Sequence, residues 1–317
     1  MQGLVIKNAG NLYTVLGDNG SIVSCRIKGK FRLKGIRTTN PVAVGDRVEF
    51  SDDPAPDGVS YITAIMPREN YIIRRASNLS KESHIIAANI DRAVLVITLA
   101  HPTTSTTFVD RFLATAEAYH IKALIVINKT DLLTEDDDLE LLNAFSYLYE
   151  SIGYEVVKLS AKTGEGVSKL KDMLAGQISL FSGNSGVGKS TLINDLIPGL
   201  DLRTAEISDV HDQGMHTTTF SEMFFLNGSD PKAGAVIDTP GIRGFGTIDF
   251  DKTDTGHFFP EIFRESAQCR FSNCTHTHEP GCAVREALDE CRIAASRYAS
   301  YLSILEDADE GKYRQGY

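Results

Sequence analysis

No apolar run in the 317-residue sequence is long enough to cross a bilayer. A membrane-spanning helix needs roughly 18 to 20 apolar residues, and the longest uninterrupted runs, such as residues 93–97, fall far short of that length. Residues 1–20 also lack the basic, apolar and small-residue pattern of a secretory signal. We therefore expect no membrane contact and no secretion, and we predict a cytoplasmic protein.

Cysteine is scarce, with five residues in the chain, and three of them lie near a His between residues 269 and 282. An odd number without a signal sequence favours a metal site in a reducing compartment over a set of disulfides. The sequence has no internal repeat or low-complexity tract, and its 42% apolar and 23% charged residues are ordinary for globular proteins. At roughly 100 to 200 residues per domain, the chain should form two or three domains.

The net charge of −10 is unevenly distributed. Residues 1–75 carry eleven Lys or Arg against seven Asp or Glu, whereas the rest of the chain carries 21 against 35. One segment holds six basic residues and no acidic one: Arg26, Lys28, Lys30, Arg32, Lys34 and Arg37. A basic segment on an otherwise acidic protein indicates a local contact with RNA, and the alternative is a solvated face of the domain.

Short apolar segments alternate with turns over about the first 70 residues. They predict five strands, at residues 4–6, 12–15, 21–27, 42–50 and 61–65, with Asp18-Asn19-Gly20 as a hairpin turn. Residues 42–48 resemble a strand of an OB-fold, a small barrel that often binds nucleic acid. We predict an all-β OB-fold barrel that binds RNA over residues 1–72.

From about residue 76, apolar strands alternate with helical stretches, which is typical of a parallel sheet covered on both faces. The predicted strands are residues 93–99, 123–128, 155–159, 178–182, 220–226 and 233–238. Beyond Phe245 a Cys/His-rich stretch leads into a long helical pattern at residues 283–306. We predict an α/β domain over residues 76–245 and a small, mostly helical metal-binding domain over residues 250–317.

A P-loop follows the strand at residues 178–182 and precedes a helical stretch. Its glycines let backbone N–H groups surround phosphate oxygens, while Lys189 can reach the β- and γ-phosphates and Ser190 can ligate Mg²⁺. The predicted phosphate-binding residues are Gly183, Asn184, Ser185, Gly186, Val187, Gly188, Lys189, Ser190 and Thr191.

A second motif, Asn-Lys-Thr-Asp at residues 128–131, resembles the guanine-recognition motif of GTPases. The Asp131 carboxylate can accept from N1–H and the exocyclic amine of guanine together, and adenine offers neither donor at that edge. Ser-Ala-Lys at residues 160–162 resembles the companion motif whose backbone N–H contacts guanine O6. GTP is favoured, with an ATPase or metabolic kinase as the alternative. The predicted base-binding residues are Asn128, Lys129, Asp131, Ser160, Ala161 and Lys162.

A third motif, Asp-Thr-Pro-Gly, closes the strand at residues 233–238. Asp238 can hold Mg²⁺ through a water, and the Gly241 amide can sense the γ-phosphate. Residues 214–219, Gly-Met-His-Thr-Thr-Thr, lie where a switch segment with a Mg²⁺-binding Thr is expected. In most GTPases the base motifs follow the P-loop, whereas here they precede it. We predict a circularly permuted P-loop GTPase, because permutation leaves the strand-end loops at the same places in space.

Three thiols and a nitrogen ligand lie within fourteen residues: Cys269, Cys274 and Cys282, with His276 or His278. Three thiolates and an imidazole form a full tetrahedral set for structural zinc, with no open position for catalysis. The metal would stabilise the fold of a small domain that has little core of its own.

A basic OB-like barrel, a permuted GTPase and a Cys/His module together resemble the ribosome small-subunit-dependent GTPase A family, over essentially the whole chain. The resemblance implies a GTPase that binds the immature small ribosomal subunit and its rRNA late in assembly, is stimulated by it, and leaves after hydrolysis to GDP. It selects His276 over His278. We expect a monomer with one structural Zn²⁺ per chain, Mg²⁺ with GTP, and no membrane partner.

Ile242 occupies the position of the Gln that orients the attacking water in many GTPases. An aliphatic side chain cannot orient water. The resemblance points to His216, whose imidazole can orient or deprotonate water, with Lys189 stabilising the transferred phosphoryl group. The ribosome is the alternative source of the water-orienting group. A GTP-gated RNA-binding module with incidental hydrolysis is the rival function, and turnover with and without subunits separates the two.

Overall fold

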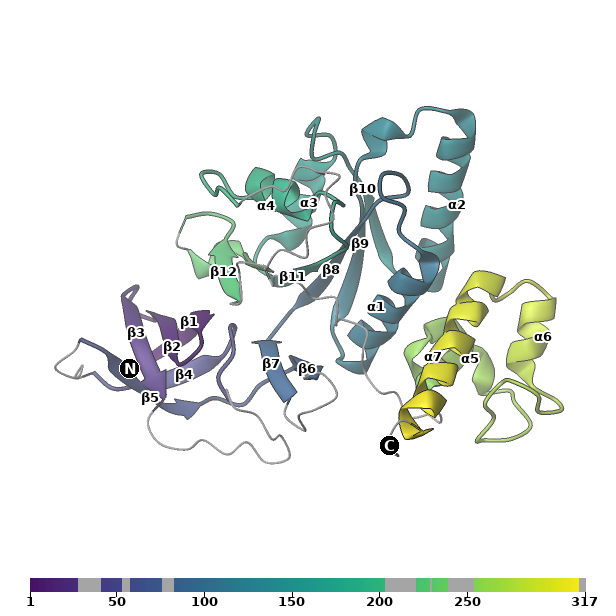
Figure 1. Cartoon of the computed structure of the whole chain (residues 1–317), viewed down its shortest axis with the longest axis horizontal. Helices are drawn as coiled ribbons and strands as arrows, with labels where there is room; N and C mark the ends of the chain where they lie inside the picture. Colours follow the sequence, from purple (N-terminus) through teal and green to yellow (C-terminus); the bar gives the residue numbers. More distant parts are fainter. Residues whose placement is uncertain are drawn as a thin grey trace.

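The computed structural model describes residues 1–27, 41–52, 58–75, 83–202, 221–228, 230–238 and 254–313. Figure 1 shows three units: a β-barrel, a sheet flanked by helices, and a group of helices near the C-terminus. None of the helices described is long and apolar enough to span a membrane. Several predicted functional residues lie outside the described part of the chain: Lys28, Lys30, Arg32, Lys34, Arg37, His216, Gly241 and Ile242.

The first unit is a closed five-stranded barrel. Its strands are β1 (Gln2–Ala9), β2 (Leu12–Gly17), β3 (Ile22–Ile27), β4 (Arg47–Phe50) and β5 (Ser60–Ile65). The pairings run in a circle, β1-β2-β3-β5-β4 and back to β1, so every strand has a partner on both sides. Alternate residues such as Val5, Val15 and Phe50 fill the interior. The predicted OB-like barrel and its five strands are confirmed, but the strand predicted at residues 42–50 begins only at Arg47, because the chain turns at Gly45.

The second unit has the strand order β10-β9-β8-β11-β13-β12. Its first five strands are parallel, and β12 is antiparallel to β13. Alternate residues of β8 enter two separate cores, one under α1 and α2 and the other under α3 and α4. The sheet is therefore covered on both faces, as predicted. The elements are β8 (Arg92–Ile97), α1 (Thr106–Ala118), β9 (Lys122–Ile127), α2 (Asp136–Ile152), β10 (Glu155–Lys158), α3 (Val167–Leu174), β11 (Ile178–Ser182), α4 (Lys189–Leu196), β12 (Glu222–Phe225) and β13 (Ala235–Asp238).

A hairpin of β6 (Tyr71–Arg75) and β7 (Ser83–Ala88), which is not among the predicted elements, joins these two units. Its last residues pair with the barrel: Val44 bridges Ala87, and the Ala88 N–H donates to Val44 O at 2.9 Å. A Cβ on Gly45 would lie 2.0 Å from Ala88 O, so only glycine allows this approach. This contact holds the hairpin against the barrel, and it joins residues too far apart in the chain for a local pattern to encode.

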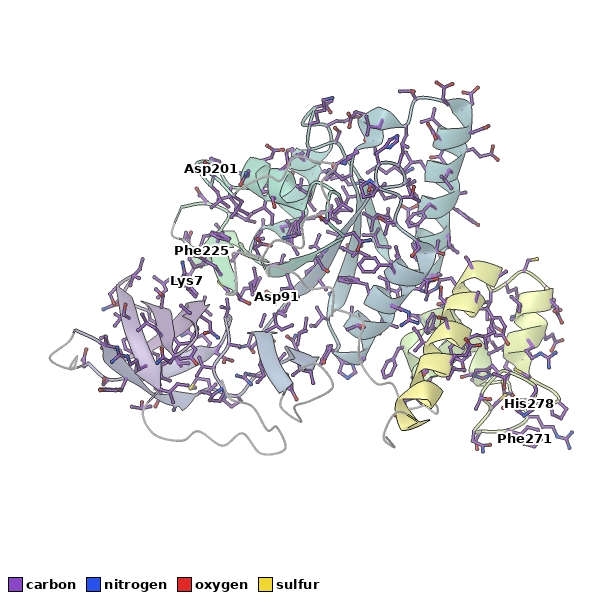
Figure 2. All side chains as sticks on the ribbon, in the orientation of Figure 1. Lys7, Asp91, Asp201, Phe225, Phe271 and His278 are labelled. Atoms are coloured by element: carbon purple, nitrogen blue, oxygen red, sulfur yellow. The ribbon has the colours of Figure 1, made fainter. Side chains whose placement is uncertain are left out.

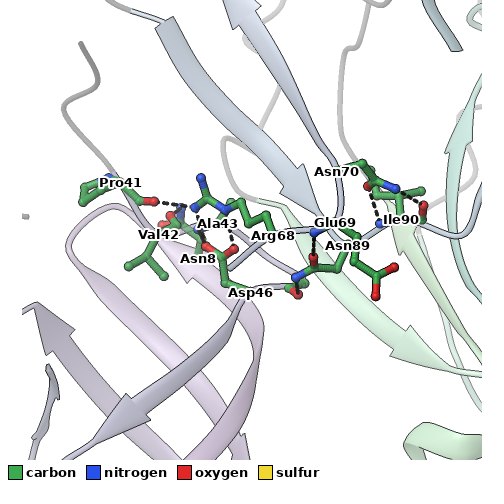
Figure 3. Close-up of polar contacts among 11 residues, drawn as sticks. Asn8, Pro41, Val42, Ala43, Asp46, Arg68, Glu69, Asn70, Asn89 and Ile90 are labelled. Carbon is green, nitrogen blue, oxygen red and sulfur yellow. Dashed lines mark hydrogen bonds and ion pairs between the residues drawn. The ribbon is translucent and has the colours of Figure 1, made fainter. Parts of the chain in front are cut away.

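Polar contacts between loops also fix the barrel to the sheet (Figure 3). Asp46 is fully buried, and each of its carboxylate oxygens accepts from the Arg68 guanidinium at 2.6 Å. The Asn70 side-chain amide pairs with both backbone groups of Ile90 at 2.8 Å. Because Ile90 lies two residues before β8, the loop that leaves the barrel is tied directly to the sheet.

The third unit contains the 3₁₀ helix η3 (Thr255–Phe258) and helices α5 (Pro260–Ser266), α6 (Ala283–Asp289) and α7 (Ala295–Tyr313). The prediction of one long helical pattern over residues 283–306 is wrong, because the chain turns between α6 and α7. Cys291 adopts a φ of 59° at that turn, which a helix cannot contain. The predicted mostly helical character of the unit is confirmed.

A buried ion-pair network joins the third unit to the second. Arg297 of α7 is fully buried and donates to both oxygens of Glu261 in α5, at 2.6 and 3.1 Å, and to Asp110 of α1 at 2.8 Å. The Tyr149 hydroxyl of α2 also donates to Asp110, at 2.8 Å. Because a buried charge is costly without partners, this network specifies how the helical unit docks on α1 and α2.

Candidate nucleotide and metal sites

The P-loop connects β11 to α4 at the carboxyl ends of the parallel strands. Gly183, Gly186 and Gly188 have positive φ angles, which glycine adopts readily. A Cβ on Gly188 would lie 2.5 Å from Asn128 Nδ2, so glycine is needed where the loop meets the base motif. The first N–H groups of α4 point to the end of the strands, where a helix N-terminus favours a phosphate. Asn184 and Ser185 are exposed.

The predicted phosphate and Mg²⁺ residues meet in the structure. Strands β11 and β13 are adjacent, with Phe181 opposite Asp238. Lys189, the first residue of α4, donates a hydrogen bond to Asp238, and their side chains are only 18% and 17% exposed. Ser190 follows in the same helical turn. These donors and acceptors suit a phosphate with a hard cation, provided that the Lys189 amine turns from Asp238 to the phosphate oxygens.

Asn128 connects three of the predicted motifs. Its buried side-chain amide donates to Val187 O of the P-loop at 2.8 Å. Its oxygen accepts from the N–H groups of Lys129 at 2.8 Å and Ala161 at 3.0 Å. The two base motifs and the P-loop, far apart in the sequence, are therefore held in one place.

Asp131, the carboxylate predicted to read the base, has a partner that orients it. The Ser160 hydroxyl donates to Asp131 Oδ1 at 2.6 Å and accepts from the Thr163 N–H at 3.2 Å. Asp131 lies in the 3₁₀ helix η1 (Thr130–Leu132), directly after β9. The sequence predicts only a backbone contact for this motif, and the role of the Ser160 side chain emerges from the structure. Lys162 is exposed.

One part of the site has no sequence motif. The loop after β8, residues 98–105, lies beside the P-loop, because a Cβ on Gly186 would lie 3.5 Å from Pro102. Lys129 Nζ also donates to His101 O at 2.6 Å. Only the strand order could have indicated this loop. Strand β8 lies between β9 and β11, so the loop at its carboxyl end falls between the loop of residues 128–131 and the P-loop.

The four predicted metal ligands form one cluster. The Sγ atoms of Cys269, Cys274 and Cys282 and the His276 nitrogen all lie within 4.8 Å of one another. His276 Nδ1 is 3.6 Å from the Cys269 sulfur and 3.5 Å from the Cys282 sulfur, and the imidazole is buried. His278 is exposed and lies outside the cluster. Three thiols and an imidazole in this arrangement fit a tetrahedral zinc ion.

Hydrogen bonds from neighbouring side chains hold the loop around His276 in shape. Glu279 accepts from the Thr275 N–H at 2.8 Å and from the Thr277 N–H at 3.0 Å, one on each side of His276. The Tyr298 hydroxyl of α7 donates to His276 O at 2.6 Å. Burial raises the pKa of the Cys274 thiol to about 12, so metal binding there would displace a proton.

Comparison with known proteins agrees with this geometry. Residues 2–60 match the RsgA N-terminal domain, and residues 65–248 match the RsgA GTPase domain. Over all 317 residues of both chains, the sequence is 59% identical to the small ribosomal subunit biogenesis GTPase RsgA of Bacteroides fragilis strain YCH46. It is 56% identical to the protein of that name from Porphyromonas gingivalis strain W83, again over the full length of both chains.

Two solved structures share the fold. YjeQ from Thermotoga maritima superposes with a TM-score of 0.78 at 35% identity, covering 97% of this chain and 98% of that one. YloQ, described as a circularly permuted GTPase, superposes with a TM-score of 0.74 at 28% identity, covering 98% and 95%. The permuted order of motifs predicted from the sequence is thereby confirmed.

Asp131→Asn should weaken GTP binding by roughly tenfold or more, because the carboxylate that accepts from two guanine donors is lost. It should improve binding of xanthosine triphosphate, whose base has a carbonyl where guanine has an amine. Competition between the two nucleotides measures both effects. Asp137→Asn, at an exposed carboxylate of α2, is the matched control. Full GTP affinity in Asp131→Asn would remove the residue from base recognition.

Cys274→Ser should lower a zinc content of about one ion per chain and loosen the region beyond residue 254, since a tetrahedral set loses one thiolate. Metal analysis and hydrogen exchange measure the two effects, and GTP binding should persist. Cys291→Ser, at an exposed thiol outside the cluster, should change neither. Stoichiometric zinc in Cys274→Ser would contradict this ligand set.

Proposed function

Because this chain belongs to the RsgA family of GTPases, we propose that it acts in late assembly of the small ribosomal subunit. There it hydrolyses GTP to GDP and phosphate with stimulation by the subunit. One observation carries the proposal: the likeness to relatives named for this role runs through all three units of the chain. We propose that the protein acts as a monomer in the cytoplasm, where ribosomal subunits are assembled.

The phosphate chemistry is assigned to residues at the ends of β11 and β13. The P-loop N–H groups of residues 183–191 and the Lys189 amine hold the β- and γ-phosphates. Ser190 and, through a water, Asp238 are the residues that would hold Mg²⁺, which supplies positive charge against the transferring phosphoryl group. The Gly241 amide contacts the γ-phosphate. The contact between Lys189 and Asp238 supports this set, because it brings these groups to one point.

Guanine recognition is assigned to the two base motifs. Asp131 accepts from the base, and the Ser160 hydroxyl keeps its carboxylate oriented. The Ala161 N–H, which also donates to Asn128, reaches guanine O6. Lys129, Asn128 and Lys162 complete the pocket.

The water-orienting group is assigned to His216 of the switch segment. Ile242 cannot fill this role, and imidazole can orient or deprotonate water in line with the γ-phosphate. The other possible source of this group is the ribosomal subunit, and the two sources differ in how a His216 variant responds to subunits.

The barrel is proposed to bind rRNA through the basic segment that begins at Arg26, an exposed residue of β3. The local excess of positive charge supports this assignment, because the rest of the chain would repel phosphates. The division into an RNA-binding domain at residues 1–72, a GTPase domain at 76–245 and a zinc domain with one structural Zn²⁺ at 250–317 is part of the proposal.

Lys189→Ala should reduce both GTP affinity and turnover, because its amine contacts the phosphates in the ground state and the transition state. His216→Ala should keep GTP affinity and lower turnover by roughly 10²- to 10⁴-fold, the range of a general-base contribution. Nucleotide titration and single-turnover rates separate the two variants. Unchanged subunit-stimulated turnover in His216→Ala would leave the ribosome as the source of the water-orienting group.

GTP hydrolysis should rise with added small subunits but not with large subunits or free RNA. Reversing Lys28, Lys30, Arg32 and Lys34 to Glu should abolish subunit association and this stimulation. Association of the parent should weaken steeply with salt, because neutralised phosphates release counterions. Sedimentation and turnover assays measure these effects.

The matched control reverses four exposed lysines of the GTPase unit outside the nucleotide motifs: Lys122, Lys158, Lys169 and Lys232. It should keep both association and stimulation, and GTP affinity verifies folding of both variants. A basic-segment variant that binds subunits with the parent's affinity and salt dependence would show that the barrel is not the main RNA contact. If GTP turnover of the parent protein does not change when small subunits are added, the proposed function itself is contradicted.

A further inference from the structure

Four charged side chains form a row across the sheet, from the P-loop to the barrel. Glu222 in β12 lies opposite Asp238 in β13 and also opposite Lys7 in β1. Asp238 accepts from Lys189. Opposite residues of antiparallel strands project from the same face, so the order is Lys189, Asp238, Glu222, Lys7. Figure 2 labels Lys7 where the barrel approaches β12.

The barrel end of the row is a direct contact between two units. Lys7 Nζ donates to Glu222 Oε1 at 3.0 Å, across 215 positions of sequence. The neighbouring backbone bond, from Asn8 N–H to Ser221 O at 3.3 Å, continues the sheet from β12 into the barrel. The Lys7 and Glu222 side chains are 43% and 37% exposed, so substitutions there disturb little of the core.

In this row, repulsion between two carboxylates is offset by two lysines. Glu222 and Asp238 are like charges directly opposite each other, which destabilises an antiparallel pair. Each carboxylate is offset by its own lysine, Lys7 for Glu222 and Lys189 for Asp238. The negative charge of Asp238 stays offset only while the Lys189 amine remains beside it.

Nucleotide binding changes that balance, because Lys189 is the lysine of the P-loop. When its amine turns to the phosphate oxygens, Asp238 loses its partner and its repulsion of Glu222 is no longer offset. The remaining positive group in the row is Lys7, on the far side of Glu222. Glu222 is therefore driven towards Lys7 and the barrel.

We propose that Glu222 and Lys7 are positioning residues that transmit the occupancy of the phosphate site to the barrel. Departure of Lys189 from Asp238 strengthens the ion pair between Lys7 and Glu222 and tightens the pairing of β1 with β12 at Asn8. The barrel is then held more firmly against the sheet with nucleotide bound than without. This coupling requires nucleotide binding only and does not depend on the subunit.

Hydrogen exchange of the Asn8 backbone amide, followed by NMR in the full-length protein, tests the coupling. The two samples are nucleotide-free protein and protein saturated with GDP in Mg²⁺-free buffer, which keeps Asp238 without a cation. GDP should slow exchange at Asn8 by roughly 2- to 5-fold, the range that an exposed ion pair allows. Lys189→Ala should show the slow rate without any nucleotide, because Asp238 has already lost its partner.

Exchanging the two charges gives the sharpest variant. In the double variant Lys7→Glu with Glu222→Lys, the ion pair is kept, but the residue opposite Asp238 is now positive. Departure of Lys189 should then draw this side chain towards Asp238 and away from the barrel, so GDP should speed exchange at Asn8. A merely structural ion pair would not reverse the sign of the response. Glu222→Gln should abolish the response.

The control is an ion pair of similar exposure inside the barrel, Arg47 with Asp18 at 2.9 Å. Asp18→Asn should leave the GDP response of Asn8 as in the parent. Equal exchange at Asn8 in nucleotide-free and GDP-saturated parent would overturn the proposal. So would a charge-exchanged variant that responds with the parent's sign.

Discussion

The side-chain amide of Asn128 holds three segments of the chain together, and the nucleotide site depends on it. Its donor and its acceptor are both used inside the protein, towards the P-loop and towards the second base motif. Leaving such a buried group unpaired costs about 1–3 kcal/mol, so placing any one of the three loops favours the placement of the other two. These hydrogen bonds join loops that are adjacent in the fold, whatever their order along the chain. The permuted order of the motifs therefore does not alter the site.

Two further units adjoin the GTPase sheet. The barrel precedes it and is attached twice, through the loop contacts of Asp46 and Asn70 and through the pairing of β1 with β12. The helical unit follows it and is docked on α1 and α2 by Arg297, buried between two carboxylates. Each attached unit therefore contacts an element next to the nucleotide site. The helical unit contacts α1, which follows the loop of residues 98–105 beside the P-loop. The barrel contacts β12, which pairs with β13, the strand that carries Asp238.

Local patterns predicted the elements whose structure has local causes. Residues 93–97 of the fully buried β8 form a continuous apolar run, and the P-loop glycines supply the positive φ angles that their turn requires. The hairpin of β6 and β7 escaped prediction because it forms against Val44 of the barrel, more than 25 positions earlier in the chain. The break between α6 and α7 escaped it because apolar residues keep a helical spacing across the turn at Cys291.

The sequence by itself determined which chemical groups this protein possesses: a P-loop, a carboxylate predicted to read the base and four candidate metal ligands, each set by residue type and short spacing. For the candidate metal site this was sufficient, because all four residues lie within fourteen positions and a short loop can bring them together. Only the tertiary structure decided which distant groups meet, such as Ser160 with Asp131 and Lys7 with Glu222. The register between strands is set by how the two cores and the barrel pack, and packing over such separations leaves no trace in the spacing of residues along the chain.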